Sequence, residues 1–175
     1  MSKTDIDQKL FRSLDIRGVA DPRHFDKLRD DKSAYSVKLT PEITEVIGKS
    51  IAQVFKPEKV VLGYDARITS PKLAESIKKS LLESGIDVDI IGLCSTDQVY
   101  FAVGYYRYDL GIMITASHAD KILNGIKISK YKDCKVLPVA IGTGLELIRY
   151  AAIKQEFEGK YQTGREQEKI GRAHV

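Results

Sequence analysis

The chain has 175 residues, a length that suits one domain or a domain and a half. Hydrophobic residues make up 43% and charged residues 30%, values typical of a globular protein that can bury a core without disulfides. The formal net charge is +4 with acidic and basic residues interleaved, which argues against a nucleic-acid-binding surface.

The N-terminus and the cysteines indicate where such a protein works. The N-terminus lacks the apolar stretch of a signal peptide, and no apolar run approaches the length of a membrane span. Cys94 and Cys134 lie in mostly apolar surroundings, without the CxxC or Cys/His spacing of a zinc site. We therefore expect two reduced thiols in a cytoplasmic protein that contacts neither nucleic acid nor a membrane.

The first half of the chain alternates between predicted strands and helices, beginning with a strand around residues 14–19. Thr40 and Pro41 predict a helix start, since threonine can accept the capping hydrogen bond and proline needs no donor at the first helical position. One apolar face at helical spacing follows. Its residues are Ile43, Val46, Ile47, Ile51, Val54 and Phe55.

A β-α-β unit comes next. Short apolar runs at 59–65 and 88–93 predict strands that are buried on both faces. Between them, Ser70 and Pro71 repeat the cap-plus-proline signal of a helix start, and Gly85 predicts the helix end. We expect a right-handed crossover.

The second half continues the pattern. It predicts a helix over 96–107, a buried strand over 109–115, an alternating strand over 125–130 and a last helix after 142. Together the elements predict an α/β domain with three layers, α/β/α, and a mixed sheet of about four strands. We place this domain at residues 1–155.

The remaining residues, 156–175, lack apolar periodicity and are rich in polar and turn-forming residues, so we expect a disordered tail. The final stretch I-G-R-A-H-V, residues 170–175, resembles the translation of a sequencing adapter that runs into a stop codon. We therefore expect the gene to be cut off near Lys169 and the chain to be a fragment.

Chemistry concentrates in the stretch I-T-A-S-H-A-D-K-I-L-N-G-I-K, residues 114–127. Ser117 needs activation to act as a nucleophile, and the adjacent His118 is poorly placed as its base because neighbouring side chains diverge. A phosphoryl group on Ser117 would instead need cations nearby. Lys127 is one candidate and Arg17 is another, since a guanidinium fork suits phosphate recognition.

The same residues also fit ordinary structural roles. Ser117 could be a plain loop serine, Lys127 a solvated strand lysine and His118 a hydrogen-bonding residue of the loop. These alternatives stay open on the residues alone.

The neighbouring residues have ordinary explanations as well. Arg17 could pair with Asp15 or Asp21. Asn124-Gly125 could form a simple turn, and residues 65–67 a turn aspartate with a local ion pair. The sequence shows no group of acidic residues that could hold a metal ion unaided.

Three motifs in a fixed order make the sequence similar to a known family. They are F-R-S-L-D-I-R-G at 11–18, G-Y-D-A-R-I-T-S-P at 63–71, and I-T-A-S-H followed by N-G-I-K at 114–127. Together they resemble the first domain of the α-D-phosphohexomutases, the phosphomannomutase/phosphoglucomutase family. The resemblance covers roughly residues 10–155.

The resemblance implies a phosphoserine at Ser117. In the family this group passes its phosphoryl to a hexose monophosphate and takes the other one back from the bisphosphorylated sugar. Hexose 1-phosphate and hexose 6-phosphate are thereby interconverted in carbohydrate metabolism. It also implies Lys127 as a general acid/base, Arg17 as a contact to the phosphoryl group and a positioning role for His118.

The resemblance further implies Mg²⁺, bound by the phosphoserine oxygen of Ser117 and by three aspartates of a later D-G-D-G-D-R loop. Family enzymes have four domains, so domains II–IV would lie beyond this chain. We expect the fragment alone to be inactive.

The loop departs from the family pattern T-A-S-H-N-P. Ala119 and Asp120 replace Asn-Pro, which removes an amide and adds a negative charge beside the serine. This difference keeps a second hypothesis open, a non-catalytic homologue or sugar-phosphate-binding domain. A phosphoglucosamine mutase is a third, since such enzymes share the loop, often as S-A-S-H, although Thr115 favours the mannose/glucose type.

Overall fold

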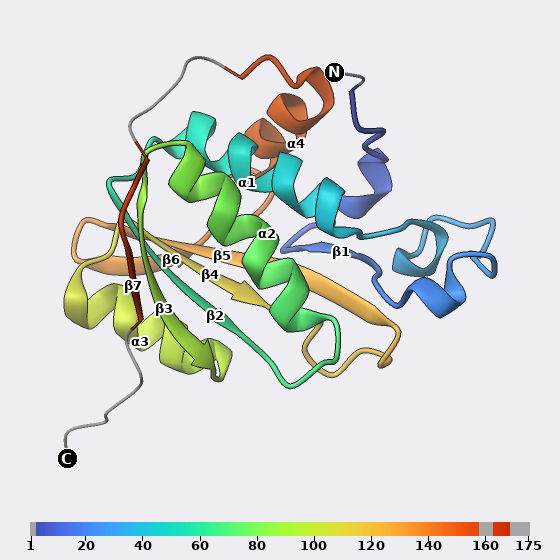
Figure 1. The fold of residues 1–175 in the computed structure, drawn as a ribbon, viewed down its shortest axis with the longest axis horizontal. Helices are drawn as coiled ribbons and strands as arrows, with labels where there is room; N and C mark the ends of the chain where they lie inside the picture. The colour runs from blue at the N-terminus through green and yellow to red at the C-terminus, as the bar shows by residue number, and fades with distance from the viewer. Residues whose placement is uncertain (1–2, 158–162, 169–175) are drawn as a thin grey trace.

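A mixed β-sheet with helices on both faces forms the protein, as the computed structural model of residues 3–157 and 163–168 shows (Figure 1). The predicted three-layer α/β/α class is confirmed. Within the described residues the sheet has seven strands, where the sequence predicted about four. The strands are β1 (Ile16–Val19), β2 (Lys59–Tyr64), β3 (Asp87–Leu93), β4 (Leu110–Ile114), β5 (Leu123–Lys132), β6 (Lys135–Pro138) and β7 (Glu166–Glu168).

The strand order places several strand ends together. The order is β1-β5-β4-β2-β3-β7. Strand β6 pairs with the second half of β5, whereas β1 pairs with its first half. Strand β2 runs parallel to β3 and β4, whereas β5 is antiparallel to β1, β4 and β6. The carboxyl ends of β1, β2 and β4 therefore lie at the same edge of the sheet as the amino end of β5.

Helices cover the two faces unequally. Three of them pack on one face and share one apolar core with it, while α3 covers the other face (Figure 1). The helices are α1 (Pro41–Phe55), α2 (Ser70–Glu83), α3 (Thr96–Tyr106) and α4 (Leu145–Lys154), with short 3₁₀ turns at Gln8–Leu10, Pro22–His24 and Ala34–Ser36. Alternation along β2 serves both cores, because Val60 and Leu62 face α1 and α2 whereas Val61 faces α3.

The helix starts agree only in part with the sequence signals. Thr40 Oγ1 accepts a hydrogen bond from the Ile43 N–H at 3.3 Å, so this cap is confirmed. Ser70 does not cap α2. It is the first residue of the helix, and its hydroxyl instead donates to the carboxylate of Asp65 at 2.5 Å. Asp65 thus accepts the hydrogen bond of the hydroxyl that the sequence assigned to capping the start of α2.

Two strands lie where the sequence predicted none. Strand β6 forms a hairpin with β5 through Asp133 and Cys134, whose φ angles of 52° and 59° are those a two-residue hairpin loop requires. Strand β7 lies within the predicted tail and pairs in parallel with β3. Its side chains are exposed, so no apolar pattern marks it. Residues 158–162 and 169–175, with the adapter-like end, lie outside the described residues.

Candidate active site

The loop between β4 and β5 presents Ser117 and His118 at the edge of the sheet where the strand ends meet. Both residues are exposed. Ser117 has φ of 55°, a left-handed conformation that costs a residue with a side chain about 1–2 kcal/mol. Its N–H donates to Thr115 Oγ1 at 2.8 Å. Such a conformation persists only where the surroundings impose it.

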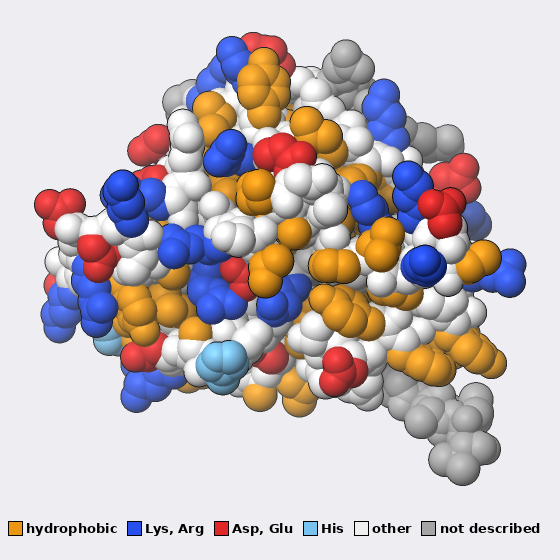
Figure 2. Space-filling model, turned by 180° about the vertical axis from the view of Figure 1, so that it is seen from behind, with side chains coloured by type: hydrophobic (Ala, Val, Ile, Leu, Met, Phe, Trp, Pro, Cys, Tyr) orange, Lys and Arg blue, Asp and Glu red, His pale blue; other side chains and the backbone are white. Residues whose placement is uncertain are grey.

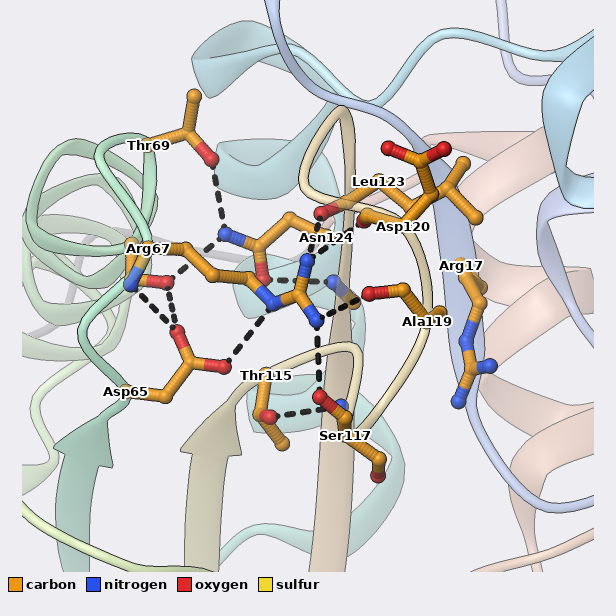
Figure 3. A network of polar contacts seen from close by, with 12 residues as sticks. Arg17, Asp65, Arg67, Thr69, Thr115, Ser117, Ala119, Asp120, Leu123 and Asn124 are labelled. Carbon is orange, nitrogen blue, oxygen red and sulfur yellow. Dashed lines mark hydrogen bonds and ion pairs between the residues drawn. The ribbon is translucent and has the colours of Figure 1, made fainter.

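Arg67 holds this loop from inside (Figure 3). Its side chain is 13% exposed, and its guanidinium donates to backbone carbonyl oxygens on both arms of the loop. The acceptors are those of Ser117 at 2.8 Å, Ala119 at 2.7 Å, Asp120 at 2.6 Å and Leu123 at 3.1 Å. The predicted ion pair with Asp65 is present, with Nε 3.1 Å from Oδ2, but it is one part of a larger network.

Asn124 extends the network to the start of α2. It lies in β5 and is fully buried, so the alternative of an Asn124-Gly125 turn is wrong. Its amide donates to the hydroxyls of Thr69 at 2.9 Å and Ser70 at 2.8 Å, and its Oδ1 accepts from the Gly125 N–H. The loop, the segment after β2 and the start of β5 are therefore fixed to one another.

Arg17 and Lys127 meet at one carboxylate. Asp15, with its side chain 7% exposed, pairs with the guanidinium of Arg17 and lies 3.7 Å from Lys127 Nζ. Of the two partners that the sequence suggested for Arg17, Asp15 is the one observed, and Asp21 pairs with Arg23 instead. Two cations around one carboxylate leave this spot net positive.

One hydrogen-bonded row links these cations to the serine loop. Arg17 in β1 lies opposite Gly125 in β5, and the Gly125 carbonyl accepts from the Thr115 N–H at 2.9 Å, two residues before Ser117. In Figure 3 the loop is drawn between Arg67 and Arg17. Arg17 Nε is buried and has no hydrogen-bond partner among the described residues, so this guanidinium retains donor capacity.

A cleft of about 820 Å³ opens beside Ser117. The turn around Arg23, the segment around Arg67 and Lys121 line it as well. The hydrogen bond from Arg23 lowers the pKa of Asp21 to about 2, so this wall carries an ion pair at neutral pH. Figure 2, the opposite view to Figure 1, shows basic side chains spread over this face with acidic ones among them, and an exposed histidine in its lower part.

The donor set fits only part of a Mg²⁺ site. Within residues 3–157 and 163–168 no group of three or more His, Cys, Asp or Glu side chains could hold a metal ion. The nearby carboxylates already have partners: Asp15 has its two cations, Asp65 has Arg67, and Asp120 accepts from the Ile122 N–H. At the loop tip, Ser117 offers a side-chain oxygen as one donor.

Comparison with known proteins bears directly on this arrangement. The sequence profile described as phosphoglucomutase/phosphomannomutase, alpha/beta/alpha domain I, matches residues 8–141. The chain belongs to this family. It is similar to a phosphomannomutase from Klebsiella pneumoniae, 34% identical over 131 residues, which covers 75% of this chain and 82% of that protein. It is also similar to a phosphomannomutase from Vibrio cholerae, 36% identical over 136 residues and 75% of this chain.

Several of the similar proteins are longer than this chain. The match covers 29% of the Vibrio cholerae protein and 28% of a phosphomannomutase from Escherichia coli. The crystal structure of a phosphoglucomutase/phosphomannomutase family protein from Burkholderia thailandensis superposes with a TM-score of 0.70 at 23% identity, covering 95% of this chain and 34% of that one. That likeness supports the fold. The chain thus spans about a third or less of these three proteins.

The sequence pointed to some of this site and missed the rest. The structure brings Arg17 and Lys127 together and places Ser117 and His118 on the adjoining loop. It adds Arg67, whose motif was noted but explained as a local ion pair. The signal that could have found it is an arginine three residues beyond the end of a buried strand, at the sheet edge that carries the serine loop. No described helix is long and apolar enough to cross a membrane.

Proposed function

We propose that this chain is the serine-bearing domain of a phosphohexomutase that interconverts hexose 1-phosphate and hexose 6-phosphate. The observation that carries the proposal is the exposed, left-handed Ser117 beside strands that bring Arg17 and Lys127 to one carboxylate. The phosphomannomutase relatives support the same reaction class.

In this proposal Ser117 carries the phosphoryl group between two sugar hydroxyls. The bond from Ser117 Oγ to phosphorus breaks as a sugar hydroxyl oxygen forms the new one. The hydroxyl proton passes to Lys127, which acts as general base in its neutral form, and the departing Ser117 oxygen takes up a proton in turn. Transfer of the other phosphoryl group of the bisphosphorylated sugar to Ser117 then restores the phosphoserine and leaves the isomeric hexose phosphate. Phosphoryl transfer depends mostly on positioning and charge neutralisation, which suits Arg17 as the contact to the phosphoryl oxygens.

His118 is proposed to orient the substrate or the phosphoryl group from the loop tip. When bound, Mg²⁺ would neutralise charge on the phosphoryl oxygens. In this chain Ser117 would supply one of its ligands, and the others would come from outside the described residues. The hexose phosphate and domains II–IV of a longer protein are the proposed partners, the chain alone is proposed to be inactive as a mutase, and the cytoplasm is the proposed location.

One observation favours a second candidate. Asp120 is exposed and lies three residues after Ser117 in the chain. Its negative charge would add to that of a phosphoserine in the same loop. A non-catalytic, sugar-phosphate-binding homologue would tolerate that charge better than a phosphoenzyme. A phosphoglucosamine mutase stays a further alternative within the same chemistry.

Covalent labelling of Ser117 separates these functions. The purified chain is incubated with a hexose 1,6-bisphosphate and Mg²⁺, and intact-mass and fragment spectra report one added phosphoryl group and its position. We expect slow labelling of Ser117, because a single transfer needs less than the complete mutase cycle, and none in Ser117→Ala. Binding of the bisphosphate without covalent transfer favours the second candidate. In a full-length protein that contains this domain, unchanged turnover of Ser117→Ala would refute the phosphoenzyme.

A further inference from the structure

Arg67 uses every hydrogen-bond donor that its side chain has. A guanidinium has five N–H groups, and here one faces Asp65, two face the carbonyls of Asp120 and Leu123, and two face those of Ser117 and Ala119. No donor remains for a phosphate. Arg17, whose Nε lacks a partner among the described residues, contrasts with it.

The acceptors explain what Arg67 does. Four of its five bonds go to neutral backbone oxygens, and they span the loop from Ser117 to the first residue of β5. Such bonds fix the path of the loop backbone and do not neutralise a charge. They close around the residue whose φ of 55° needs external support.

The guanidinium is itself held in place. Asp65 accepts from both its Nε and its backbone N–H, and Ser70 donates to the same carboxylate. Asn124 in turn holds the hydroxyl of Ser70. The planar fork is thus fixed on α2 and β5, which are rigid elements, before it meets the loop.

We propose that Arg67 is a positioning residue that imposes the loop conformation in which Ser117 is presented. The inference rests on the proposed function for what the presented serine is used for, although the conformational role stands on the contacts alone. It also accounts for the changed loop sequence, because Arg67 contacts Ala119 and Asp120 through their carbonyl oxygens and so does not depend on which side chains they carry.

The test compares two arginines of the same local design. Asp65-Ala66-Arg67 and Asp21-Pro22-Arg23 both pair an aspartate with an arginine two residues later, and both line the cleft. The side chain of Arg23 is 76% exposed. Arg23→Lys is therefore the matched control for Arg67→Lys, which keeps the charge but cannot reach four carbonyls, and Arg67→Ala is the more severe variant.

Hydrogen exchange and the three-bond H^N–Hα coupling of Ser117, both measured by NMR on the 175-residue chain, report the conformation. In Arg67→Lys we expect the amides of Ser117, Ala119 and Leu123 to exchange about tenfold faster or more, with β4 still protected. The coupling should shift towards an averaged value. Arg23→Lys should match the wild type. Wild-type exchange and coupling in Arg67→Lys would overturn the proposal, even if Arg67→Ala fails to fold.

Labelling by a hexose 1,6-bisphosphate adds the functional readout. We expect Arg67→Lys to be labelled at Ser117 at least about tenfold more slowly than wild type. Equal labelling of both proteins would overturn the positioning role. If the wild type is not labelled, transfer to Ser117 by this chain alone is refuted, and faster loop exchange in Arg67→Lys would still support the conformational role.

Discussion

Replacing Gly125 with alanine should destabilise the sheet where the candidate site is built. An added Cβ would lie 2.4 Å from the Ile16 carbonyl oxygen and 2.9 Å from that of Thr115, whereas ordinary contact begins at 3.4 Å. Both are backbone atoms of neighbouring chain segments, so relief requires β1 to move by about 1 Å from β5. Overpacking costs about 1–3 kcal/mol, and weakened β1–β5 hydrogen bonds add to it.

We therefore expect a loss of about 3 kcal/mol in the free energy of unfolding. With a urea m-value of about 2 kcal/mol per M, the unfolding midpoint should fall by about 1.5 M. Gly104→Ala is the matched control, because its Cβ would meet only the side chain of Val136 at 3.2 Å and the residue lies in α3. Its midpoint should stay the same or rise slightly, since alanine favours a helix over glycine.

The outcome for Gly125→Ala tests whether the close approach of the neighbouring backbone excludes a side chain at this position. A midpoint shift below about 0.5 M, with an unchanged m-value, would mean that the strands can separate at little cost. The argument that glycine is needed for packing at this position would then be wrong.

Three further predictions concern other parts of the molecule. Asn124→Ala should lower the unfolding free energy by about 2–3 kcal/mol in urea denaturation, because the buried hydroxyl of Ser70 and the half-buried hydroxyl of Thr69 each lose a hydrogen-bond donor. Arg23 lowers the pKa of Asp21 from 3.8 to about 2, so the pair stabilises the fold above pH 3.8 and loses this contribution as the pH falls through 2. An NMR titration of the Asp21 carboxyl should show a midpoint near pH 2, and Arg23→Ala should raise that midpoint. Burial raises the pKa of the Cys94 thiol while Cys134 is exposed, so a disulfide reagent at neutral pH should modify Cys134 quickly and Cys94 slowly; equal rates would contradict this.

Local signals in the sequence were enough for the α/β layers. The Thr40 cap, the buried run of β2 and the helical spacing of α1 each depend on residues close together in the chain, and the structure has these elements. Strand β7 could not be predicted in this way. Its three residues are exposed and pair with β3 through the backbone, which any sequence can do.

Some residues of the candidate site could likewise be predicted from the sequence, and others could not. Ser117, Lys127 and Arg17 were predicted from residue type and motif, and the structure places the two cations together. Arg67 was not predicted to hold the loop, because its acceptors are carbonyl oxygens 50 to 56 residues later in the chain. Every residue has such an oxygen, so the sequence does not show which ones will accept a hydrogen bond. Asn124 was explained as a turn because the hydroxyls that it binds, those of Thr69 and Ser70 at the start of α2, lie 55 and 54 residues away in the chain.

The support that Arg67 gives to the Ser117 loop has a practical consequence. The left-handed serine is imposed by a residue 50 positions away, so its shape exists only once β2 and β4 have paired. A synthetic peptide covering residues 114–127 would lack that support and would sample extended and right-handed conformations instead. Antibodies raised against such a peptide should therefore recognise the denatured chain on a blot and bind the native protein poorly.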